Sequence, residues 1–334
     1  MAPTCVGVVL NQSIRLTRWA KSEEKMRIVI VGPGAMGCLF AAFLSKSKEE
    51  IWLLDKHKER AQKLSQQGII VEGVSGNWQA KVKVTAEPHD IGKADLILVC
   101  VKSYDTKSAL LQAKSLVGED TLVLTLQNGI GNLEVIAEIV GEDKVMGGMT
   151  NMGSILRQAG CITHTGKGET IIGFPDGKVP VLMRSLREAF NKVGVDTRVS
   201  RDIKSVLWSK LIINIGINAI SALTGLHNGR LIEFASSRKI VRDAVTEGVK
   251  VAKRKRIKLM YDDPLAKVEA VCESTATNIS SMLQDILRKK KTEIDSLNGV
   301  IVRFGQELGI PVPVNSVLVD LIKTIESSYE VALR

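Results

Sequence analysis

The stretch RIVIVGPGAMG, residues 27–37, joins a short apolar run directly to three closely spaced glycines. An unbroken run such as RIVIV predicts a β-strand that is buried on both faces of a parallel sheet. Gly32, Gly34 and Gly37 stand in a GxGxxG frame, which permits a tight turn, close approach of backbone to a pyrophosphate, and close packing of helix on strand. The apolar CLFAAFLSK that follows predicts a helix, whose N-terminal N–H groups and positive dipole end favour phosphate. Strand, turn and helix together predict dinucleotide binding rather than an ordinary turn.

Strands and helices alternate after this first unit. The apolar runs EIWLLD (50–55), ADLILVCVK (94–102) and TLVLTLQNG (121–129) predict three more buried strands, and SALLQAKSLV predicts a helix between the last two. This alternation indicates a doubly wound α/β sheet. Shorter strands are predicted at 144–156, 161–165 and 169–173, followed by a helix at about 178–193 and a last strand at 196–200.

The pattern changes at about residue 201, after which helical periodicity continues to Arg334. Pro264 and GIPVPVN (309–315) mark breaks between helices, because glycine and proline end helices. We therefore predict a Rossmann-type dinucleotide-binding domain over residues 26–200 and an all-α domain over 201–334. Residues 1–25 have basic residues but no clean apolar core of a targeting signal, so we predict a non-core N-terminal extension that the protein can lose.

Composition argues against several classes of partner. The net charge is +10, with the basic runs KRKR (253–256) and RKKK (288–291), but no nucleic-acid motif accompanies them and only 4% of residues are aromatic. We interpret these runs as solvated helix faces and expect no nucleic-acid partner. The longest apolar run, 211–226, is too short for a membrane span and contains two asparagines, so we expect no membrane segment. The five scattered cysteines favour a cytoplasmic protein without disulfides, and no metal site is predicted.

The end of the second predicted strand bears on the choice of cofactor. Asp55 is followed by Lys56, His57, Lys58 and Arg60. An acid at this position commonly holds the ribose 2′-hydroxyl of NAD, whereas a base accommodates the 2′-phosphate of NADP. The positive charge that follows Asp55 favours NADPH over NADH.

A polar stripe crosses the apolar segment WSKLIINIGINAISALTG, residues 208–225. Lys210, Asn214 and Asn218 are spaced four apart, so on a helix they lie on one face. Buried polar groups are costly without partners, which indicates that this face lines a cleft. A lysine there can supply both a positive charge and a proton to a carbonyl oxygen that gains negative charge during reduction.

Polar residues at three further places could complete the site. Lys102 and Asn128 end two predicted strands, at the sheet edge where GPGAMG is expected. We predict one long helix over 277–299, on which Asn278, Ser281 and Glu293 share about a third of the circumference. Taken alone, this pattern leaves open that Glu293 only caps or pairs with a neighbouring helix.

These motifs together resemble the ketopantoate reductase (2-dehydropantoate 2-reductase) family. The resemblance covers roughly residues 26–330, and the pairing of K-x3-N-x3-N with a later SSMLQD and TEID is more specific than the glycine frame. The matching segments are GPGAMG (32–37), Lys102, LQNGIGN (126–132), WSKLIINIGINAISALTG (208–225), NISSMLQDI (278–286) and TEIDSLNG (292–299).

The resemblance implies NADPH-dependent reduction of 2-dehydropantoate to pantoate, in pantothenate and coenzyme A biosynthesis. It implies an active site between the two domains, with Lys210 as general acid and Glu293 contacting substrate and supporting catalysis. The implied substrate-binding residues are Asn128, Asn214, Asn218, Asn278 and Ser281. The implied cofactor-binding residues are Gly32, Pro33, Gly34, Ala35, Met36, Gly37, Lys56, Lys102 and Asn128. Lys56 stands where the family usually has an arginine, so a 2′-phosphate would lose its fork-shaped partner here.

Alternatives remain open at this point. The protein could reduce another 2-oxo acid, or belong with related Rossmann and helical dehydrogenases of 3-hydroxy acids or glycerol 3-phosphate, although the glutamate of TEID disfavours the latter. A nonenzymatic NADP sensor is a third reading, which the retained Lys210 and Glu293 disfavour. The expected partner is a small 2-oxo acid, and a homodimer through the helical domain stays open.

Overall fold

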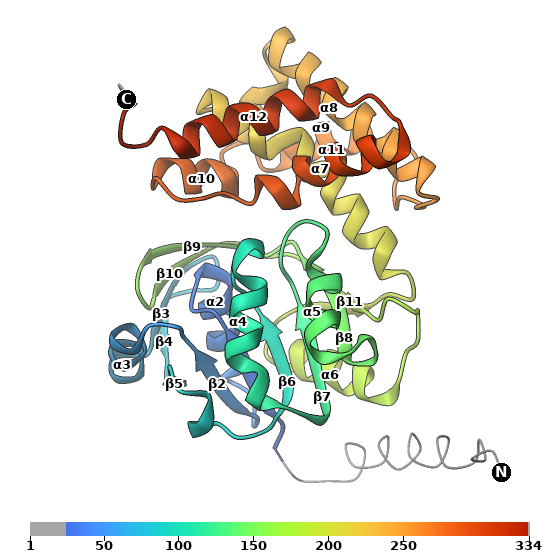
Figure 1. The fold of residues 1–334 in the computed structure, drawn as a ribbon. Helices are drawn as coiled ribbons and strands as arrows, with labels where there is room; N and C mark the ends of the chain where they lie inside the picture. The colour runs from blue at the N-terminus through green and yellow to red at the C-terminus, as the bar shows by residue number, and fades with distance from the viewer. Residues whose placement is uncertain (1–24, 333–334) are drawn as a thin grey trace, which may run out of the picture. The chain divides into compact units, whose positions relative to one another are not determined.

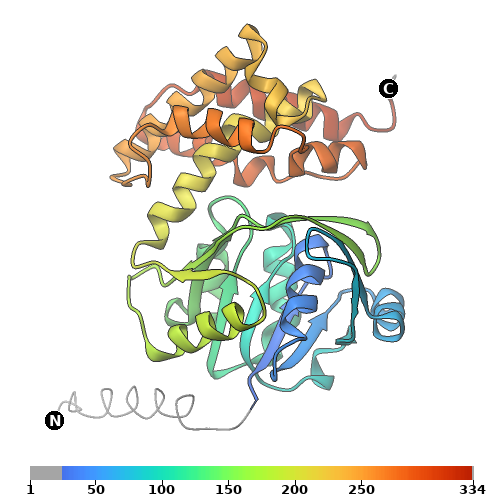
Figure 2. The same cartoon turned by 180° about the vertical axis from the view of Figure 1, so that it is seen from behind.

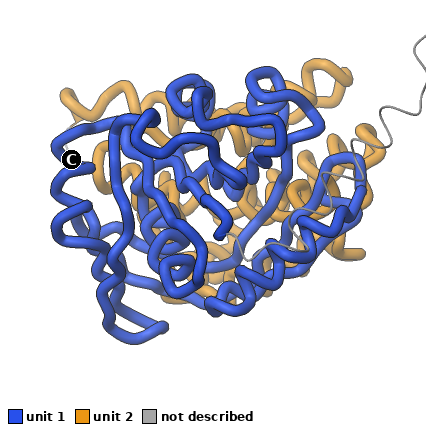
Figure 3. Tube along the Cα trace, turned by 90° about the horizontal axis from the view of Figure 1, so that it is seen from below, with its two compact units in different colours: residues 1–127, 132–203 blue, residues 128–131, 204–334 orange. Residues whose placement is uncertain are grey.

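The computed structural model describes residues 25–332, so the predicted N-terminal extension lies almost wholly outside the described residues. The chain divides into two compact units (Figures 1 and 3). Unit 1 comprises the residues up to Gln127 together with Asn132–Ile203. Unit 2 comprises Asn128–Gly131 and the residues from Lys204 onward. The α/β unit followed by a helical unit confirms the predicted fold class.

An eight-stranded sheet forms the centre of unit 1, in the order β12-β11-β8-β7-β6-β1-β2-β5. Neighbouring strands are parallel except β11 and β8, which are antiparallel. The strands are β1 (Arg27–Val31), β2 (Glu50–Leu54), β5 (Lys83–Thr85), β6 (Ala94–Val99), β7 (Val117–Thr125), β8 (Val145–Thr150), β11 (Thr170–Gly173) and β12 (Thr197–Val199). The strand order reverses direction at β1 and β6, which is where open α/β sheets bind ligands at the carboxyl ends of their strands.

Helices cover both faces of this sheet, which explains the unbroken apolar runs. Ile28 and Ile30 of β1 pack in one cluster with α2 and α6, while Val29 and Val31 pack in another with α4 and α5. All four side chains are buried, so the strand has no polar face. The helices are α2 (Ala35–Leu44), α3 (Lys58–Gln67), α4 (Thr106–Gln112), α5 (Asn132–Val140) and α6 (Val181–Lys192).

A second sheet of four strands packs beside α2, as both views show (Figures 1 and 2). Its order is β4-β3-β10-β9, formed by β3 (Ile69–Gly73), β4 (Trp78–Ala80), β9 (Gly153–Gln158) and β10 (Cys161–Gly166). The predicted strand at 144–156 is wrong as a single element, because β8 and β9 belong to different sheets. The sequence pattern does not predict β3, β4 or β5.

Unit 2 is helical among its described residues, as the sequence predicts. Its helices are α7 (Ile203–Thr224), α8 (Ala235–Arg254), α9 (Pro264–Ser274), α10 (Ser281–Leu287), α11 (Asn298–Leu308) and α12 (Pro313–Ser327), with the short 3-10 turns η5 (Asn228–Ile232) and η6 (Ile294–Ser296). Pro264 and Pro313 each begin a helix, and Gly309 ends one in the left-handed conformation, which confirms the predicted breaks. By length and composition α7 could cross a membrane, but 72% of its most apolar window is buried inside the protein, so it is a core helix.

The predicted single helix over 277–299 is wrong. α10 is only seven residues long, is capped by the Ser280 hydroxyl, and is followed by a chain reversal in which Lys289 has a φ of 54°. Bonds made within unit 2 hold the non-helical segment: Thr292 N–H donates to Glu326 at 2.7 Å. The helical arc calculated for Asn278, Ser281 and Glu293 therefore does not exist, because the three lie on different local structures.

A buried polar network joins α7, α8, α11 and α12 inside unit 2. Glu247 of α8 accepts bonds from the backbone N–H groups of Val314 and Asn315, both at 2.9 Å, and so caps the start of α12. The Asn315 side chain donates to Glu247 at 2.7 Å and accepts from Asn298 at 2.9 Å. Asn298 also donates to the Ile215 carbonyl of α7 at 3.2 Å. The network ties the helix that carries the polar stripe to the last helices of the chain.

Candidate functional site

The turn after β1 has the form of a phosphate cradle. Gly32 has a φ of 100°, and a Cβ on Gly37 would collide with the Gly32 carbonyl, so both positions need glycine for the fold itself. Apart from its chain neighbours, the nearest atom to a Cβ on Gly34 would be the Cys100 carbonyl oxygen at 4.0 Å, so the protein leaves space there. α2 has neither a side-chain cap nor an acid in its first turn, so the N–H groups of this turn suit an anion. These features fit the pyrophosphate of a dinucleotide over the predicted residues Gly32, Pro33, Gly34, Ala35, Met36 and Gly37.

Charges at the end of β2 are arranged in pairs. Asp55 is buried, and its carboxylate accepts two bonds from Arg60, at 2.5 and 2.6 Å, which neutralise it. The same carboxylate raises the pKa of Arg60. Lys56 is more exposed and its ammonium lies 3.5 Å from the Asp105 carboxylate. Arg60 therefore compensates the acid that is expected to favour NAD, while Lys56 lies at the surface and pairs with Asp105.

Lys102 follows β6, the neighbour of β1 at the point where the strand order reverses. It is half-buried, and its carbonyl accepts a bond from the Asp105 N–H at 2.8 Å. In unit 1 the structure therefore brings Lys102 to the same sheet edge as GPGAMG, where the sequence expects it.

In unit 2, the structure brings Lys210 of α7 within electrostatic reach of Glu293. Glu293 is 7% exposed and precedes η6. Burial lowers the pKa of Lys210 to about 8, and the negative charge of Glu293 partly offsets this by raising it. A half-buried ammonium within electrostatic reach of a carboxylate, with a pKa lowered to about 8, suits proton transfer.

The rest of the stripe extends from this pair to the start of α10. Asn214 Nδ2 is buried and has no hydrogen-bond partner among the described protein atoms, so a ligand oxygen could satisfy it. Asn218 is buried, and its carbonyl accepts a bond from the Ser280 hydroxyl at 3.4 Å. Ser281, half-buried, begins α10, and Asn278, exposed, precedes it. The hydrogen bond from Ser280 thus brings the start of α10 beside Asn218.

Asn128 begins the loop Asn128–Gly131, which groups with unit 2. Ile130 N–H donates to the Ser296 carbonyl of η6 at 3.1 Å, three residues after Glu293. A Cβ on Gly129 would collide with the same carbonyl, so the loop lies directly against η6. The sequence pattern predicts Asn128 at the end of a strand, whereas β7 ends at Thr125 and Asn128 lies in this loop.

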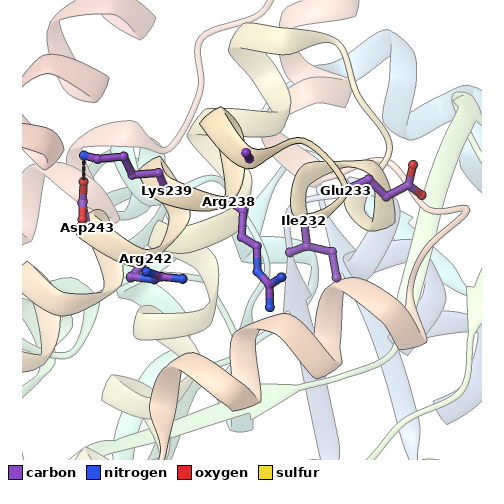
Figure 4. A pocket seen from close by; sticks show the side chains of 7 residues that line it. Ile232, Glu233, Arg238, Lys239, Arg242 and Asp243 are labelled. Atoms are coloured by element: carbon purple, nitrogen blue, oxygen red, sulfur yellow. Dashed lines mark hydrogen bonds and ion pairs between the residues drawn. The ribbon is translucent and has the colours of Figure 1, made fainter.

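A separate hollow of about 470 Å³ contains none of these residues (Figure 4). It lies along η5 and the start of α8, and it is lined by Ile232, Glu233, Ala235, Arg238, Lys239, Arg242 and Asp243. Two of its cations already have carboxylate partners: Arg238 with Glu269 and Lys239 with Asp243, each at 2.7 Å. The hollow therefore has little unpaired charge for an anionic substrate, and we do not assign the reaction to it.

Comparison with known proteins matches one family over nearly the whole chain. Residues 28–177 match the family model "Ketopantoate reductase PanE/ApbA", and residues 202–326 match its C-terminal counterpart. The chain is 36% identical to the 2-dehydropantoate 2-reductases of Halobacterium salinarum and Pyrococcus horikoshii, covering 89% and 90% of this chain and 98% of each relative.

Solved structures agree with the sequence comparison. The PanE/ApbA family ketopantoate reductase from Ralstonia eutropha superposes with a TM-score of 0.84 at 35% identity, covering 91% of this chain and 99% of that one. A D-mandelate dehydrogenase solved with NADH and anilino(oxo)acetate has a TM-score of 0.85 at 27% identity, over 92% of this chain and all of that one. With both domains matched in order and at these identities, the chain belongs to the ketopantoate reductase family.

Proposed function

We propose that this protein reduces 2-dehydropantoate to pantoate with NADPH, a step of pantothenate biosynthesis. The observation that carries the proposal is the half-buried Lys210 within electrostatic reach of the buried Glu293, in a chain whose curated relatives are 2-dehydropantoate 2-reductases. A nicotinamide dinucleotide supplies the hydride for the 2-oxo carbon when it is bound. The open space at Gly34 and the uncapped start of α2 fit the pyrophosphate of such a cofactor.

Lys210 acts as the general acid. As the carbonyl carbon is reduced, its oxygen gains negative charge, and the Lys210 ammonium donates a proton to that oxygen. The bond that breaks is N–H of Lys210, the bond that forms is O–H of the product alcohol, and the neutral amine regains its proton from solvent. Burial of Lys210 lowers the cost of releasing the proton, while the neighbouring carboxylate of Glu293 keeps the ammonium populated near neutral pH.

The Glu293 carboxylate accepts a hydrogen bond from the 4-hydroxyl of the substrate and so recognises it. A carboxylate would repel the carboxylate of a 2-oxo acid but accepts a strong hydrogen bond from a hydroxyl. The substrate carboxylate is then left to Ser281 and to amide donors, and the unpaired Asn214 Nδ2 supports such a role. Asn128, Asn218 and Asn278 supply further neutral contacts that position the substrate without adding charge.

NADPH is preferred because the end of β2 carries net positive charge. Arg60 neutralises Asp55, so the carboxylate no longer opposes a 2′-phosphate, and Lys56 offers an exposed ammonium. Lys102 completes the cofactor side of the site at the end of β6. Since lysine binds phosphate as a point charge, we expect the preference to be smaller than an arginine fork would give.

A second candidate is the reduction of a 2-oxo acid with an aromatic substituent, such as benzoylformate, with NADH. The structural likeness to D-mandelate dehydrogenase with NADH and an aryl-substituted oxo acid supports it. Both reactions use the same hydride and proton transfers, so the fold does not distinguish them. The basic side chains of Lys56 and Arg60 favour NADPH. The Glu293 carboxylate favours a hydroxylated substrate.

One assay tests the function directly. The purified protein is given NADPH or NADH together with ketopantoate, 2-oxoisovalerate, pyruvate or benzoylformate, and kcat/KM is measured for each pair from the loss of reduced cofactor. We expect the highest value for NADPH with ketopantoate. A higher value for benzoylformate with NADH would replace this proposal by the second candidate, and no turnover of any acid would reject both.

We also propose that the enzyme works in the cytoplasm and forms a homodimer through unit 2. The four cysteines in the described part of the chain are all free, which supports a reducing compartment. Val317 and Leu321, one turn apart on α12, are 56% and 46% exposed, which supports an apolar contact on this helix. Cell fractionation and light scattering of the purified protein test the two statements.

A further inference from the structure

Three uncharged side chains, those of Thr106, Gln127 and Asn132, form hydrogen bonds with one another at the base of the loop Asn128–Gly131. Thr106 is the first residue of α4, and its side chain is 1% exposed. Its hydroxyl accepts a hydrogen bond from Gln127 Nε2 at 2.8 Å and donates one to Asn132 Oδ1 at 3.2 Å. Gln127 and Asn132 are the residues on either side of the loop, so one hydroxyl holds both of its ends.

Gln127 extends the same network to the neighbouring loop. Its Nε2 also donates to the Val101 carbonyl at 2.7 Å, and its Oε1 accepts from the Thr125 hydroxyl at 2.9 Å. Both hydrogens of the amide nitrogen therefore have acceptors, and the amide cannot be flipped without setting its oxygen against the Val101 carbonyl. Val101 immediately precedes Lys102.

The network thus fixes two backbone segments at the carboxyl ends of β6 and β7, which are parallel neighbours. One segment carries Lys102, which we assign to the cofactor side of the site, and the other leads into Asn128, which we assign to the positioning of the substrate. None of the three network side chains ionises, and all are buried, so the network holds its geometry without depending on pH.

We propose that Thr106 and Gln127 are positioning residues for catalysis, which act by holding Lys102 and Asn128 in their productive places. The proposal rests on the function proposed above. A displacement of about 1 Å at a reacting centre can cost about a hundredfold in rate, so loss of the network should reduce activity even though neither residue touches substrate.

The test compares Thr106→Val with Thr106→Ser. Valine keeps the shape and removes the hydroxyl, whereas serine keeps the hydroxyl. We expect kcat/KM for ketopantoate to fall about tenfold or more in Thr106→Val, and to stay close to wild type in Thr106→Ser. The dissociation constant of NADPH, followed by fluorescence, should rise in the valine variant, and it is a readout that does not depend on ketopantoate.

Thr121→Val is the matched control. Thr121 lies on β7, is 2% exposed, donates to the Ala94 carbonyl at 2.5 Å and accepts from the Gly118 N–H at 2.7 Å. Its hydroxyl has the same number of partners but touches neither loop. We expect Thr121→Val to lower the melting temperature as Thr106→Val does, with kcat/KM and the NADPH dissociation constant unchanged. Equal kinetic losses in both variants would mean that the effect is general destabilisation, and would reject the positioning role.

Gln127→Met alone covers the case in which Thr106→Val is too unstable to assay, and a double-mutant cycle adds a second test where both single variants fold. Gln127→Met keeps the length of the side chain and removes the amide, and it should give the same kinetic loss alone. In the combined variant, the loss should match that of one substitution, because both break one network. Wild-type kinetics in Gln127→Met, or strictly additive losses, would overturn the proposal. If the wild-type protein binds NADPH but does not reduce ketopantoate, the assigned function fails, and the NADPH dissociation constants still decide the positioning role.

Discussion

Lys210 has a titration that should be visible in the kinetics. Burial lowers its pKa to about 8, and a general acid works only in its protonated form. For reduction, kcat/KM should therefore be level below this pKa and fall by about tenfold per pH unit above it. The profile is measured with ketopantoate and saturating NADPH. A value that stays level up to pH 10 would contradict the assignment of Lys210 as the acid.

Replacing Lys210 tests the same role through the size of the loss in kcat. Lys210→Ala should lower kcat by about a hundredfold or more, the usual scale for losing a positioned acid, and should leave NADPH binding intact because the phosphate cradle belongs to unit 1. The control is Lys204→Ala on the same helix, since Lys204 is exposed and takes no part in the proposed chemistry. Wild-type turnover in Lys210→Ala would remove this residue from the mechanism.

Glu293→Gln should separate two substrates. Glutamine keeps the shape of the side chain but is a weaker acceptor for the 4-hydroxyl of ketopantoate, so kcat/KM for this acid should fall. The loss should be much smaller for 2-oxoisovalerate, which lacks the hydroxyl. Both acids are measured with both proteins. Equal losses for the two would mean that Glu293 acts through Lys210 or the fold, and does not read the hydroxyl.

At the level of single residues, the sequence indicated the charged members of the site better than the neutral ones. Lys210 is conspicuous because charge in an apolar segment needs a partner, whereas Glu293 was indicated by the family resemblance; the structure brings the two within electrostatic reach. Their roles remain proposals. Thr106, Gln127 and Asn132 had no such signal, since they carry no charge and Thr106 meets the other two only after β6 and β7 pair.

The glycine turn before α2 allows a prediction about the element as a whole. Gly34→Ala adds a methyl group where, apart from its chain neighbours, the protein has no atom closer than 4.0 Å, so the melting temperature should stay near that of wild type, while NADPH binding weakens. Gly37→Ala adds the same group where the Gly32 carbonyl lies, so the melting temperature should fall. Thermal unfolding and NADPH titration of both variants check this. Normal NADPH affinity in Gly34→Ala would show that the cofactor does not pass over this turn.

Elements were predictable where one pattern extended over a whole segment. The strands β1, β2 and β6 are apolar and buried on both faces, and α7 keeps a helical period throughout. β3, β4 and β5 were missed because they are not continuous buried apolar runs: each carries an exposed polar residue, Glu72 in β3, Gln79 in β4 and Lys83 in β5. The long helix over 277–299 was wrong because bonds to distant residues, such as that from Thr292 to Glu326, outweigh local helical preference.

The charge of the whole molecule should affect how quickly it captures its substrates. The protein has a net charge of +10, whereas a 2-oxo acid and NADPH are both anions. Added salt screens this attraction, so kcat/KM should fall as ionic strength rises, while kcat at saturation should change little. The measurement compares sodium chloride with an equal osmolarity of sucrose as control. A kcat/KM that is independent of salt would show that long-range attraction does not contribute.

The cap that Glu247 provides for α12 has a consequence for how the protein is made. The two residues that it caps lie 67 and 68 positions further along the chain, and no nearer side chain replaces it, since Val312 cannot cap a helix. During synthesis, domains generally fold from the N-terminus onward. Until Asn315 has left the ribosome, Glu247 therefore lacks the donors that it accepts from in the folded protein, and Asn298 has only the Ile215 carbonyl as a partner. Unit 2 cannot complete its packing, and the enzyme cannot become active, until α12 has been translated.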